Sequence, residues 1–382
     1  MRKKFLPYGF HWIDDADIKE VTNVLKSDWM VMGPKVEEFE GAVCKYVGCK
    51  HGVAVNSGTS ALDIAVASLG IKKGEIITTP FTFVATANSI LFNNLKPVFA
   101  DIRRDTYNID PNEIKKKITR KTKAIIYVDF AGHPCDIEEI KEIAEERDLY
   151  LIEDAAHAIG AEYRGKKVGP FADITMFSFH PVKHITTGEG GMSVTDDEEL
   201  SRKMRILRNQ GVDIGARERF GPSASWAYDV KLLGRNYRMT DFQAALGLSQ
   251  MKKLEEFIKR RQSLATLYTK KLGGTPLVTL PLVKPEVRHV WHLYTILLDK
   301  KLNRDKFISA MRAKNIGVNV HYSPIYRFSY YQENFRFNPK DFPVTEDISS
   351  RIVSLPIFPR MSDEDVEYVV SAVKESIGVN AR

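Results

Sequence analysis

Apolar residues follow two alternating patterns along this chain. Short continuous apolar runs, EIITT, AIIYVDF, LYLIED and DITMFSF, are typical of strands that are buried on both faces of a parallel sheet. Between them apolar residues recur at helical spacing, as in the segment 57–69, where Leu62 and Val66 share one face and which Gly70 ends. From about residue 30 to 250 this alternation predicts an α/β fold, a mainly parallel sheet with helices on both faces.

The pattern changes after residue 250 and predicts a smaller α+β domain. WHLYTILL and GVNVHY have the composition of strands, Asn303 to Ala313 predicts a helix, and a last helix opens at Ser362. The chain shows no internal repeat and no low-complexity linker. The predicted parts are an N-terminal segment (1–30), a large domain (31–250) and a small domain (251–382).

Two further helices connect these parts. Thr240 and Asp241 are suited to cap a long helix that runs from the large domain into the small one through Phe242, Leu246 and Leu254. Near the N-terminus a helix is expected from about Asp15 to Ser27. We expect this helix to pack beside the small domain.

Composition narrows the class of protein. The net charge is +7, but the sequence contains no basic block, zinc spacing or recognition helix, so we expect small acidic substrates rather than nucleic acid. No stretch approaches a membrane span, and the N-terminus lacks the apolar core of a signal peptide. Three cysteines, Cys44, Cys49 and Cys135, lack metal-ligand spacing and are expected to be reduced thiols. We therefore expect a cytoplasmic protein without a metal site.

The candidate for covalent chemistry is Lys183, within FSFHPVKHITTGEGG. A surface lysine is the ordinary interpretation in a chain with 56 Lys and Arg. Here, however, a strand-like run delivers the amine to the edge of a sheet, Ser178 precedes it by five residues, and a glycine-rich turn follows. Such a position suits an amine that binds an aldehyde cofactor, and partial burial favours its uncharged form. The cofactor that this setting suggests is pyridoxal phosphate.

Other motifs meet the remaining demands of that cofactor. Ser57, Thr59 and Ser60 open a helix, whose N-terminus favours a phosphate, although such clusters cap helices of every kind. Asp154 ends an apolar strand, where a buried acid needs a cation such as a protonated pyridine, although it is equally suited to cap the next helix. The aromatic residues of TTPFTFVATA, Phe81 and Phe83, offer an apolar surface, although aromatic residues in such turns more often belong to the core.

Five motifs in order, NSGTSAL, TTPFTFVATA, EDAAHAIGA, FSFHPVKHITTGEGG and GRNYRMTDFQAALGLSQ, resemble the DegT/DnrJ/StrS family of sugar aminotransferases, fold-type I pyridoxal phosphate enzymes. The resemblance runs from about Pro7 to the C-terminal helix. It implies that Lys183 forms the Schiff base, that Asp154 pairs with the pyridine nitrogen and that His157 lies near the ring hydroxyl. The remaining implied cofactor contacts are Ser57, Thr59, Ser60 and Ser178 at the phosphate, Phe83 on the ring, and Asn236 at the phosphate of the neighbouring subunit of a homodimer.

The resemblance also implies a reaction. The amino group of L-glutamate would pass through the cofactor to a keto-sugar linked to a nucleotide, leaving 2-oxoglutarate. ITTGEGG and VHYSPIYRFSYYQ resemble members that aminate C4 of a 4-keto-6-deoxy sugar. Where the family often has a Thr-Gln-Gly turn this chain has Val31-Met32-Gly33, which leaves the identity of the sugar open. The implied substrate contacts are Tyr8, Arg238, His321 and Tyr322.

Three alternatives remain. The first is amination of a 3-keto sugar, because only placement of the ring distinguishes C3 from C4. The second is a pyridoxal phosphate-dependent sugar dehydratase, in which histidine replaces the reactive lysine; here His184 follows Lys183, but the step from Ser178 favours the lysine. The third is a non-catalytic regulatory protein that has kept the fold.

Overall fold

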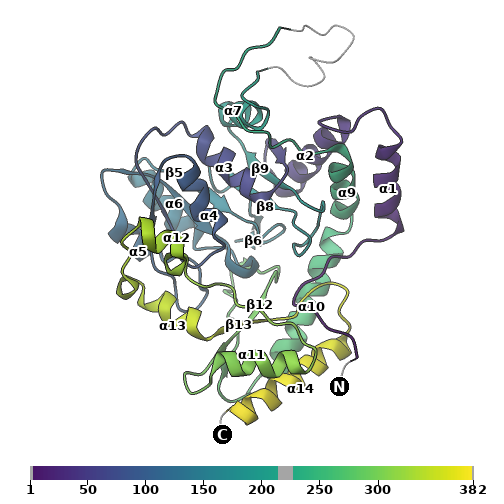
Figure 1. The fold of residues 1–382 in the computed structure, drawn as a ribbon, viewed down its shortest axis with the longest axis vertical. Helices are drawn as coiled ribbons and strands as arrows, with labels where there is room; N and C mark the ends of the chain where they lie inside the picture. Colours follow the sequence, from purple (N-terminus) through teal and green to yellow (C-terminus); the bar gives the residue numbers. More distant parts are fainter. Residues whose placement is uncertain (1–2, 214–226, 381–382) are drawn as a thin grey trace.

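The computed structural model describes residues 3–213 and 227–380 of the 382-residue chain. Its centre is a seven-stranded sheet in the order β1-β9-β8-β5-β4-β2-β3 (Figure 1). Strand β9 is antiparallel to both of its neighbours, and the other neighbouring pairs are parallel. In chain order these strands are β1 (His51–Val55), β2 (Glu75–Thr78), β3 (Lys96–Phe99), β4 (Thr122–Val128), β5 (Tyr150–Asp154), β8 (Ile174–Ser178) and β9 (Gly191–Thr195).

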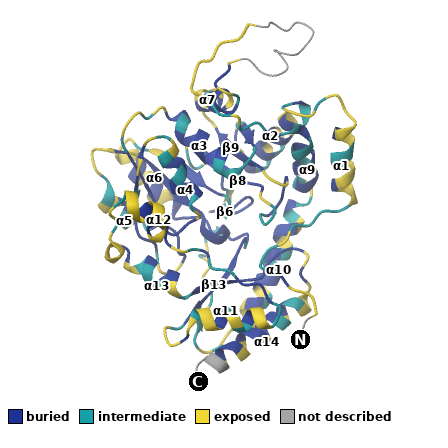
Figure 2. Cartoon of the chain, viewed as in Figure 1, coloured by how far each residue is buried: buried dark blue, intermediate teal, exposed yellow. Residues whose placement is uncertain are grey.

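Helices cover both faces of this sheet, which is why most residues of its strands are buried (Figure 2). Along β5, Leu151 packs into one core and Ile152 into the other. On the Ile152 face lie α3 (Gly58–Ser68), α4 (Ala85–Phe92) and α7 (Glu198–Arg208); on the Leu151 face lie α2 (Pro34–Val47), α5 (Pro111–Lys117), α6 (Ile137–Glu146) and α9 (Asp241–Met251). The four predicted strands are confirmed as β2, β4, β5 and β8, and the predicted helix over 57–69 as α3.

The C-terminal part is built on a three-stranded antiparallel sheet in the order β10-β12-β13. Its strands are β10 (Val278–Thr279), β12 (Tyr294–Leu298) and β13 (Ile352–Leu355), and its helices are α10 (Leu254–Leu272), α11 (Arg304–Ala313), α12 (Ser329–Asn334), α13 (Pro343–Arg351) and α14 (Asp363–Asn380). A small third sheet joins β6 (Glu162–Tyr163), β7 (Lys166–Lys167) and β11 (Val287–Arg288). None of the helices in 3–213 and 227–380 combines the length and the apolar character needed to cross a membrane.

The single long helix predicted after Thr240 is wrong, because the chain breaks between α9 and α10. Thr240 does cap α9 through a capping box with Gln243. A two-residue turn, Lys252 and Lys253, separates it from α10, and the ammonium group of Lys253 lies 2.6 Å from the fully buried carboxylate of Asp17. Beyond the break α10 contributes to two cores, with Phe257 in the first and Leu264 in the second. The domain boundary after residue 250 therefore stays a prediction.

The N-terminal segment touches both parts of the molecule. Its helix, α1 (Asp15–Leu25), lies along α9 rather than beside the C-terminal sheet, and Gln250 donates a hydrogen bond of 2.7 Å to Asp17. Only the residues before the helix reach the C-terminal core, where Leu6 is buried. The predicted strand GVNVHY is also wrong: within it only Asn319 bridges to Ser354, because the backbone turns away from β13 after one pair.

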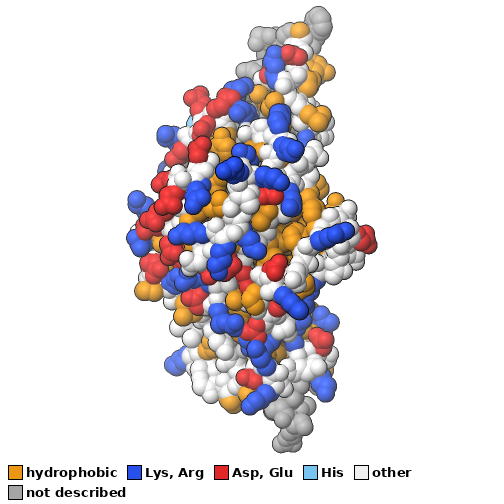
Figure 3. Space-filling view, turned by 90° about the vertical axis from the view of Figure 1, so that its left-hand side faces the viewer, with side chains coloured by type: hydrophobic (Ala, Val, Ile, Leu, Met, Phe, Trp, Pro, Cys, Tyr) orange, Lys and Arg blue, Asp and Glu red, His pale blue; other side chains and the backbone are white. Residues whose placement is uncertain are grey.

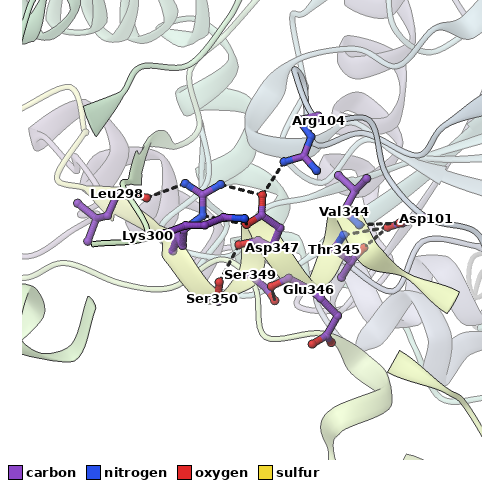
Figure 4. Close-up of polar contacts among 11 residues, drawn as sticks. Asp101, Arg104, Leu298, Lys300, Val344, Thr345, Glu346, Asp347, Ser349 and Ser350 are labelled. Atoms are coloured by element: carbon purple, nitrogen blue, oxygen red, sulfur yellow. Dashed lines mark hydrogen bonds and ion pairs between the residues drawn. The ribbon is translucent and has the colours of Figure 1, made fainter. Parts of the chain in front are cut away.

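Two carboxylates attach α13 to the large sheet (Figure 4). Asp101, just after β3, accepts hydrogen bonds of 2.9 Å from the amide groups of Val344 and Thr345 in the first turn of α13. An acid at a helix N-terminus is favoured by the helix dipole. Farther along the helix, Asp347 forms ion pairs with three cations, Arg104, Lys300 and Arg351. The helix therefore fixes the C-terminal part against the sheet.

A segment that we call the arm, residues 209–213 and 227–238, projects beyond α7 at the top of Figure 1. Its two described portions pair through bridges from Asn209 to Asn236 and from Val212 to Val230. Several apolar side chains along it are exposed, most of all Leu233, whose exposed fraction is 88%. The arm therefore presents apolar surface away from the core of the chain (Figure 2).

Candidate active site

A cavity of about 1150 Å³ opens at the carboxyl ends of the central parallel strands. Val128, Asp154 and Ser178, which end β4, β5 and β8, all border it. Parallel strands present their carboxyl ends at one edge of a sheet, and this edge is where open α/β folds bind ligands. Residues from the C-terminal part, including His321 and Tyr322, complete the wall. The cavity therefore lies between the two parts of the molecule.

Lys183 borders the cavity from the turn that follows β8, and its amide donates to the carbonyl of His180 at 2.9 Å. Desolvation in the pocket lowers the pKa of its ammonium group to about 8; the charge of Asp154 raises this pKa and that of Arg261 lowers it. A large fraction of the amine is therefore uncharged just above neutral pH, as a nucleophile requires. His184 differs: it is buried, its Nε2 lies 2.9 Å from the carbonyl oxygen of Val290, and it does not border this cavity.

Asp154 is almost fully buried at the floor of the cavity, with 4% of its surface exposed. Thr86 donates a hydrogen bond of 2.8 Å to its Oδ2, and the amide of Ala156 donates one of 3.2 Å to its Oδ1. Burial raises the pKa of this carboxyl, and these hydrogen bonds and the charge of Lys183 only partly oppose that rise. A cation placed beside Asp154 would therefore be strongly stabilised.

The opening turn of α3 lies against the end of β8. Ser57 caps the helix by accepting from the amide of Ser60 at 3.1 Å, and both side chains border the cavity with Thr59. A Cβ added at Gly58 would lie 2.9 Å from the Cβ of Ser178, so only glycine lets the helix approach this strand so closely. Three hydroxyl groups and the positive end of a helix dipole thus meet at one end of the cavity, an arrangement that suits a phosphate.

Aromatic side chains line the other walls. Phe83 borders the cavity and 59% of its surface is exposed, whereas Phe81, the other aromatic residue that the sequence offered, is buried in the core and does not border it. Tyr322 packs between Phe83 and His157, with ring centroids 6.4 and 6.2 Å away. Tyr8 also borders the cavity, and its ring centroid is 5.3 Å from that of His321.

Two residues that the sequence singled out lie outside this chain's own cavity. Asn236 and Arg238 are in the arm, where Arg238 donates a hydrogen bond of 2.9 Å to the side chain of Asn209. The Val31–Gly33 turn is also outside the cavity and is held at the start of α9, where Asp241 accepts from the amide of Gly33 at 2.6 Å. Their roles toward a ligand stay predictions.

Sequence reasoning missed several residues of the cavity wall. His292 and Phe328 stand inside the quoted stretches WHLYTILL and VHYSPIYRFSYYQ, but neither was singled out, because they reach the cavity through the packing of the C-terminal part. Thr86, the hydrogen-bond donor to Asp154, stands inside the quoted TTPFTFVATA stretch, but nothing in its spacing indicated this bond. Asn319 belongs to the stretch that was expected to be a strand.

The residues present fit pyridoxal phosphate. A buried carboxyl with a raised pKa suits the protonated ring nitrogen, the α3 turn with Ser178 suits the phosphate, and Lys183 suits the aldehyde. These three features border one cavity. Their order, acid at the floor and phosphate site at the helix, matches the chemical demands of a single molecule.

Comparisons with known proteins agree with this geometry. The model of the DegT/DnrJ/EryC1/StrS aminotransferase family matches residues 11–374. The spore coat polysaccharide biosynthesis protein SpsC of Bacillus subtilis is 42% identical over 98% of both chains. Helicobacter pylori PseC, an aminotransferase involved in the biosynthesis of pseudaminic acid, is 36% identical with a TM-score of 0.92, covering 98% of this chain and 100% of that one.

A third similar structure is that of a cofactor form of a related protein. The putative sugar aminotransferase Spr1654 of Streptococcus pneumoniae, in its pyridoxamine phosphate form, is 29% identical with a TM-score of 0.93, covering 98% of this chain and 99% of that one. Together with the family match over nearly the whole chain, these likenesses settle the family. The chain belongs to the DegT/DnrJ/EryC1/StrS aminotransferase family and is a pyridoxal phosphate-dependent aminotransferase.

Proposed function

We propose that this enzyme transfers the amino group of L-glutamate to C4 of a nucleotide-linked 4-keto-6-deoxy sugar in the biosynthesis of a cell-surface glycan. The observation that carries the proposal is the cavity in which Lys183 and Asp154 meet beneath a wall from the C-terminal part. The names of SpsC and PseC support a role in glycan biosynthesis. The ITTGEGG and HYSPIY stretches resemble the UDP-4-amino-4,6-dideoxy-N-acetyl-altrosamine transaminase, which supports the C4 position and a UDP- or dTDP-linked sugar.

In the proposed reaction, several residues of the cavity wall have separate roles. Pyridoxal phosphate, when bound, supplies an aldehyde carbon that accepts the amino group and a ring that withdraws electrons. Asp154 would keep the ring nitrogen protonated, and Ser57, Thr59, Ser60 and Ser178 would hold the phosphate. With the cofactor bound, Lys183 would be the residue that holds its aldehyde carbon, and as a free amine its Nζ would be the base that takes the proton from the α-carbon of glutamate.

The second half-reaction runs in the opposite direction on the sugar. The amino form of the cofactor would supply the nitrogen and the electron pair that reduce the keto carbon, the keto oxygen would leave as water, and the ammonium group of Lys183 would deliver the proton to C4. Walls from both parts of the molecule, with Tyr8 and His321 on one side, hold the sugar with C4 toward Lys183. A pKa near 8 at Lys183 lets the same amine take and return this proton close to neutral pH.

The experiment that tests this function runs the reaction in reverse. The purified protein is incubated with 2-oxoglutarate and with 4-amino or 3-amino sugar nucleotides, and glutamate is quantified. We expect glutamate from the 4-amino-6-deoxy sugars only, and none from the matched Lys183→Ala variant. Turnover of 3-amino sugars alone would replace C4 by C3, and turnover of ordinary amino acids alone would remove sugars from the proposal.

Two alternatives are less well supported. A dehydratase needs histidine in place of the reactive lysine, but His184 is committed to the carbonyl of Val290 and is absent from the wall of the cavity. A regulatory protein would not need a nucleophile with a lowered pKa, yet the pKa of the Lys183 amine is lowered. For the location we propose the cytoplasm, since Cys44, Cys49 and Cys135 are buried free thiols.

We also propose that the active unit is a homodimer with shared sites. The arm carries exposed apolar side chains, including Tyr228, Val230 and Leu233, next to Asn236. A two-fold axis would place the arm of each protomer on the other, so that Asn236 reaches the phosphate and Arg238 the substrate of the partner site.

On the face shown in Figure 3, basic and acidic side chains are interspersed, with hydrophobic ones between them.

Subunit mixing tests the shared site. Neither Lys183→Ala nor Asn236→Ala homodimers should be active, whereas their mixture should recover up to a quarter or so of the activity, because one of the two sites in a heterodimer carries neither change. Asn334→Ala, a change in α12 outside the arm, is the matched partner for comparison and should not depend on mixing. Absence of recovery after verified exchange of subunits would contradict shared sites.

A further inference from the structure

Tyr322 borders the cavity with a hydroxyl group that has one hydrogen-bond partner in the part of the chain that the structure describes. Its oxygen lies 3.1 Å from Nε2 of His157. The ring is held between Phe83 and Phe130, with centroids 6.4 and 6.3 Å away, and crosses the His321 ring at 5.0 Å. Burial raises the pKa of the phenol, so that the hydroxyl keeps its hydrogen at neutral pH.

A backbone amide determines whether Tyr322 or His157 donates in this hydrogen bond. The amide of Ala131 points at Nδ1 of His157 with a separation of 3.3 Å, and an amide N–H can only donate. Nδ1 must therefore carry a lone pair. Burial lowers the pKa of His157 well below its usual value, so the ring is neutral and its single hydrogen is on Nε2. It follows that His157 donates to Tyr322, and the hydrogen of Tyr322 remains for a partner in the cavity.

The fold holds this arrangement rigidly. The amide of Leu293 donates to the carbonyl of Ala131 at 3.3 Å, and the amide of Val290 donates to that of Gly132 at 3.1 Å. The ring of His292 lies against His157 with a centroid distance of 4.3 Å. Because the loop before α6 and the strand entry before β12 are bonded together around His157, neither the imidazole nor the Ala131 amide can turn to reverse the direction.

We propose that Tyr322 donates a hydrogen bond to an acceptor oxygen of the molecule bound in the cavity, and that His157 is the positioning residue that fixes this direction. The proposal rests on the proposed function only for the identity of that oxygen, either the ring oxygen of the cofactor or the carbonyl oxygen of the keto-sugar. Both nitrogens of His157 already have partners within the chain, so in this proposal Tyr322 presents the hydrogen to the ligand, and the predicted place of His157 near the ring hydroxyl stays a prediction.

The first experiment reads the direction itself. Protein labelled with ¹⁵N at histidine is studied as the holoenzyme, and the His157 signals are identified by their loss in His157→Gln. We expect the pattern of a neutral ring that carries its hydrogen on Nε2. A hydrogen on Nδ1, or on both nitrogens, would overturn the proposal. This result does not depend on any substrate, so it stands apart from the reverse-transamination test of function.

The second experiment removes the donor with Tyr322→Phe. If the acceptor is the cofactor oxygen, the pH midpoint of the absorbance of the lysine-bound cofactor shifts upward by about 0.5 to 1 unit. If the acceptor is the sugar carbonyl, the absorbance is unchanged, KM for the keto-sugar rises about 3- to 10-fold, and the glutamate half-reaction is unaffected. Either result supports Tyr322 as a hydrogen-bond donor and identifies the oxygen that accepts from it. No change in either measurement would overturn it.

The third experiment separates direction from packing at His157. In His157→Gln the side-chain oxygen can accept from Ala131 while the amide group donates to Tyr322, whereas His157→Leu can do neither. We expect Leu to reproduce the change seen in Tyr322→Phe and Gln to restore at least about half of it, with unfolding midpoints reported for both variants. Equal losses in Gln and Leu would overturn the positioning role of His157.

Discussion

Asp154 in the cavity and Asp347 on α13 are the same residue type in opposite electrostatic settings. Burial raises the pKa of both carboxyls. At Asp347 hydrogen bonds from Arg351, Arg104 and Lys300 outweigh that rise and bring the pKa to about 2, whereas at Asp154 the opposing contacts are weaker and the pKa stays above its usual value. Figure 4 shows the cations gathered around Asp347.

The difference separates a structural acid from one reserved for a ligand. Asp347 is neutralised within the chain and holds α13 in place. Asp154 is bonded to the hydroxyl of Thr86 and an amide, which orient it without supplying a positive charge. A buried carboxyl in that state is costly alone and becomes favourable when a cation binds beside it. A cation beside Asp154, such as the protonated ring nitrogen that we propose for it, would therefore be favoured in this cavity.

The largest effect is expected from Lys183→Ala, which removes the cation of the pocket and leaves Asp154 without its electrostatic neighbour. We expect amino transfer to fall by at least about 10³-fold, because both the nucleophile and the proton carrier are lost. Borohydride reduction followed by peptide mapping should label Lys183 in the wild type and no lysine in the variant. The exposed Lys166→Ala variant should behave as the wild type; labelling elsewhere would contradict the assignment.

Asp154→Asn tests the acid that is reserved for the ligand. We expect amino transfer to fall about 100-fold or more, since an amide cannot keep the ring nitrogen protonated, while Lys183 still attaches the cofactor. Rates of each half-reaction and borohydride labelling separate the two effects. An activity within a few-fold of the wild type would show that the ring nitrogen has another partner.

The pH dependence of Asp154→Asn gives a second test of the electrostatic difference between Asp154 and Asp347. Lys183 is charged below a pKa of about 8, and the charge of Asp154 raises that value. The rate of cofactor attachment to the apoenzyme should therefore rise with pH through a midpoint near 8 in the wild type. In Asp154→Asn the midpoint should move to lower pH, because the charged amine loses its stabilising neighbour. A shift to higher pH would contradict this electrostatic account.

The smallest effect is expected from Asp347→Asn, which removes the charge of the carboxylate that holds α13 in place. Its depressed pKa contributes stability that is present above about pH 4 and is lost as the pH falls toward 2. The variant should therefore lower the free energy of unfolding at pH 7 by about 1 to 2 kcal/mol, with activity nearly unchanged.

Urea unfolding at pH 7 and at successively lower pH checks this effect. The gap between the variant and the wild type should narrow as the pH falls from 4 toward 2, because the carboxyl is protonated first in the unfolded state and near pH 2 also in the folded state. The matched variant Lys300→Ala removes a cation whose side chain is 74% exposed, so it should change stability by less than about 0.5 kcal/mol. A gap that persists down to pH 2 would mean that Asp347 acts through packing rather than charge.

The sequence determined the features that depend on neighbouring residues. Continuous apolar runs identified β2, β4, β5 and β8, since both faces of those strands are covered, and capping residues identified the starts of α3 and α9. Asp154 and Lys183 followed from their places at and after strand ends, because the carboxyl ends of parallel strands meet at one edge. These inferences required only local pattern and the geometry of a sheet.

Tertiary structure decided what depends on distant partners. The turn after Met251 lies where Lys253 pairs with Asp17, far away in the sequence, and within GVNVHY the bridge from Asn319 joins the distant residue Ser354. His292 reaches the cavity only because β12 packs beside the loop that ends at Gly132. Tyr322 and His157 are 165 residues apart, and the amide of Ala131 fixes which of them donates. The direction of a hydrogen bond depends on which donors and acceptors lie near one another in the folded protein. The order of residues in the sequence does not reveal it.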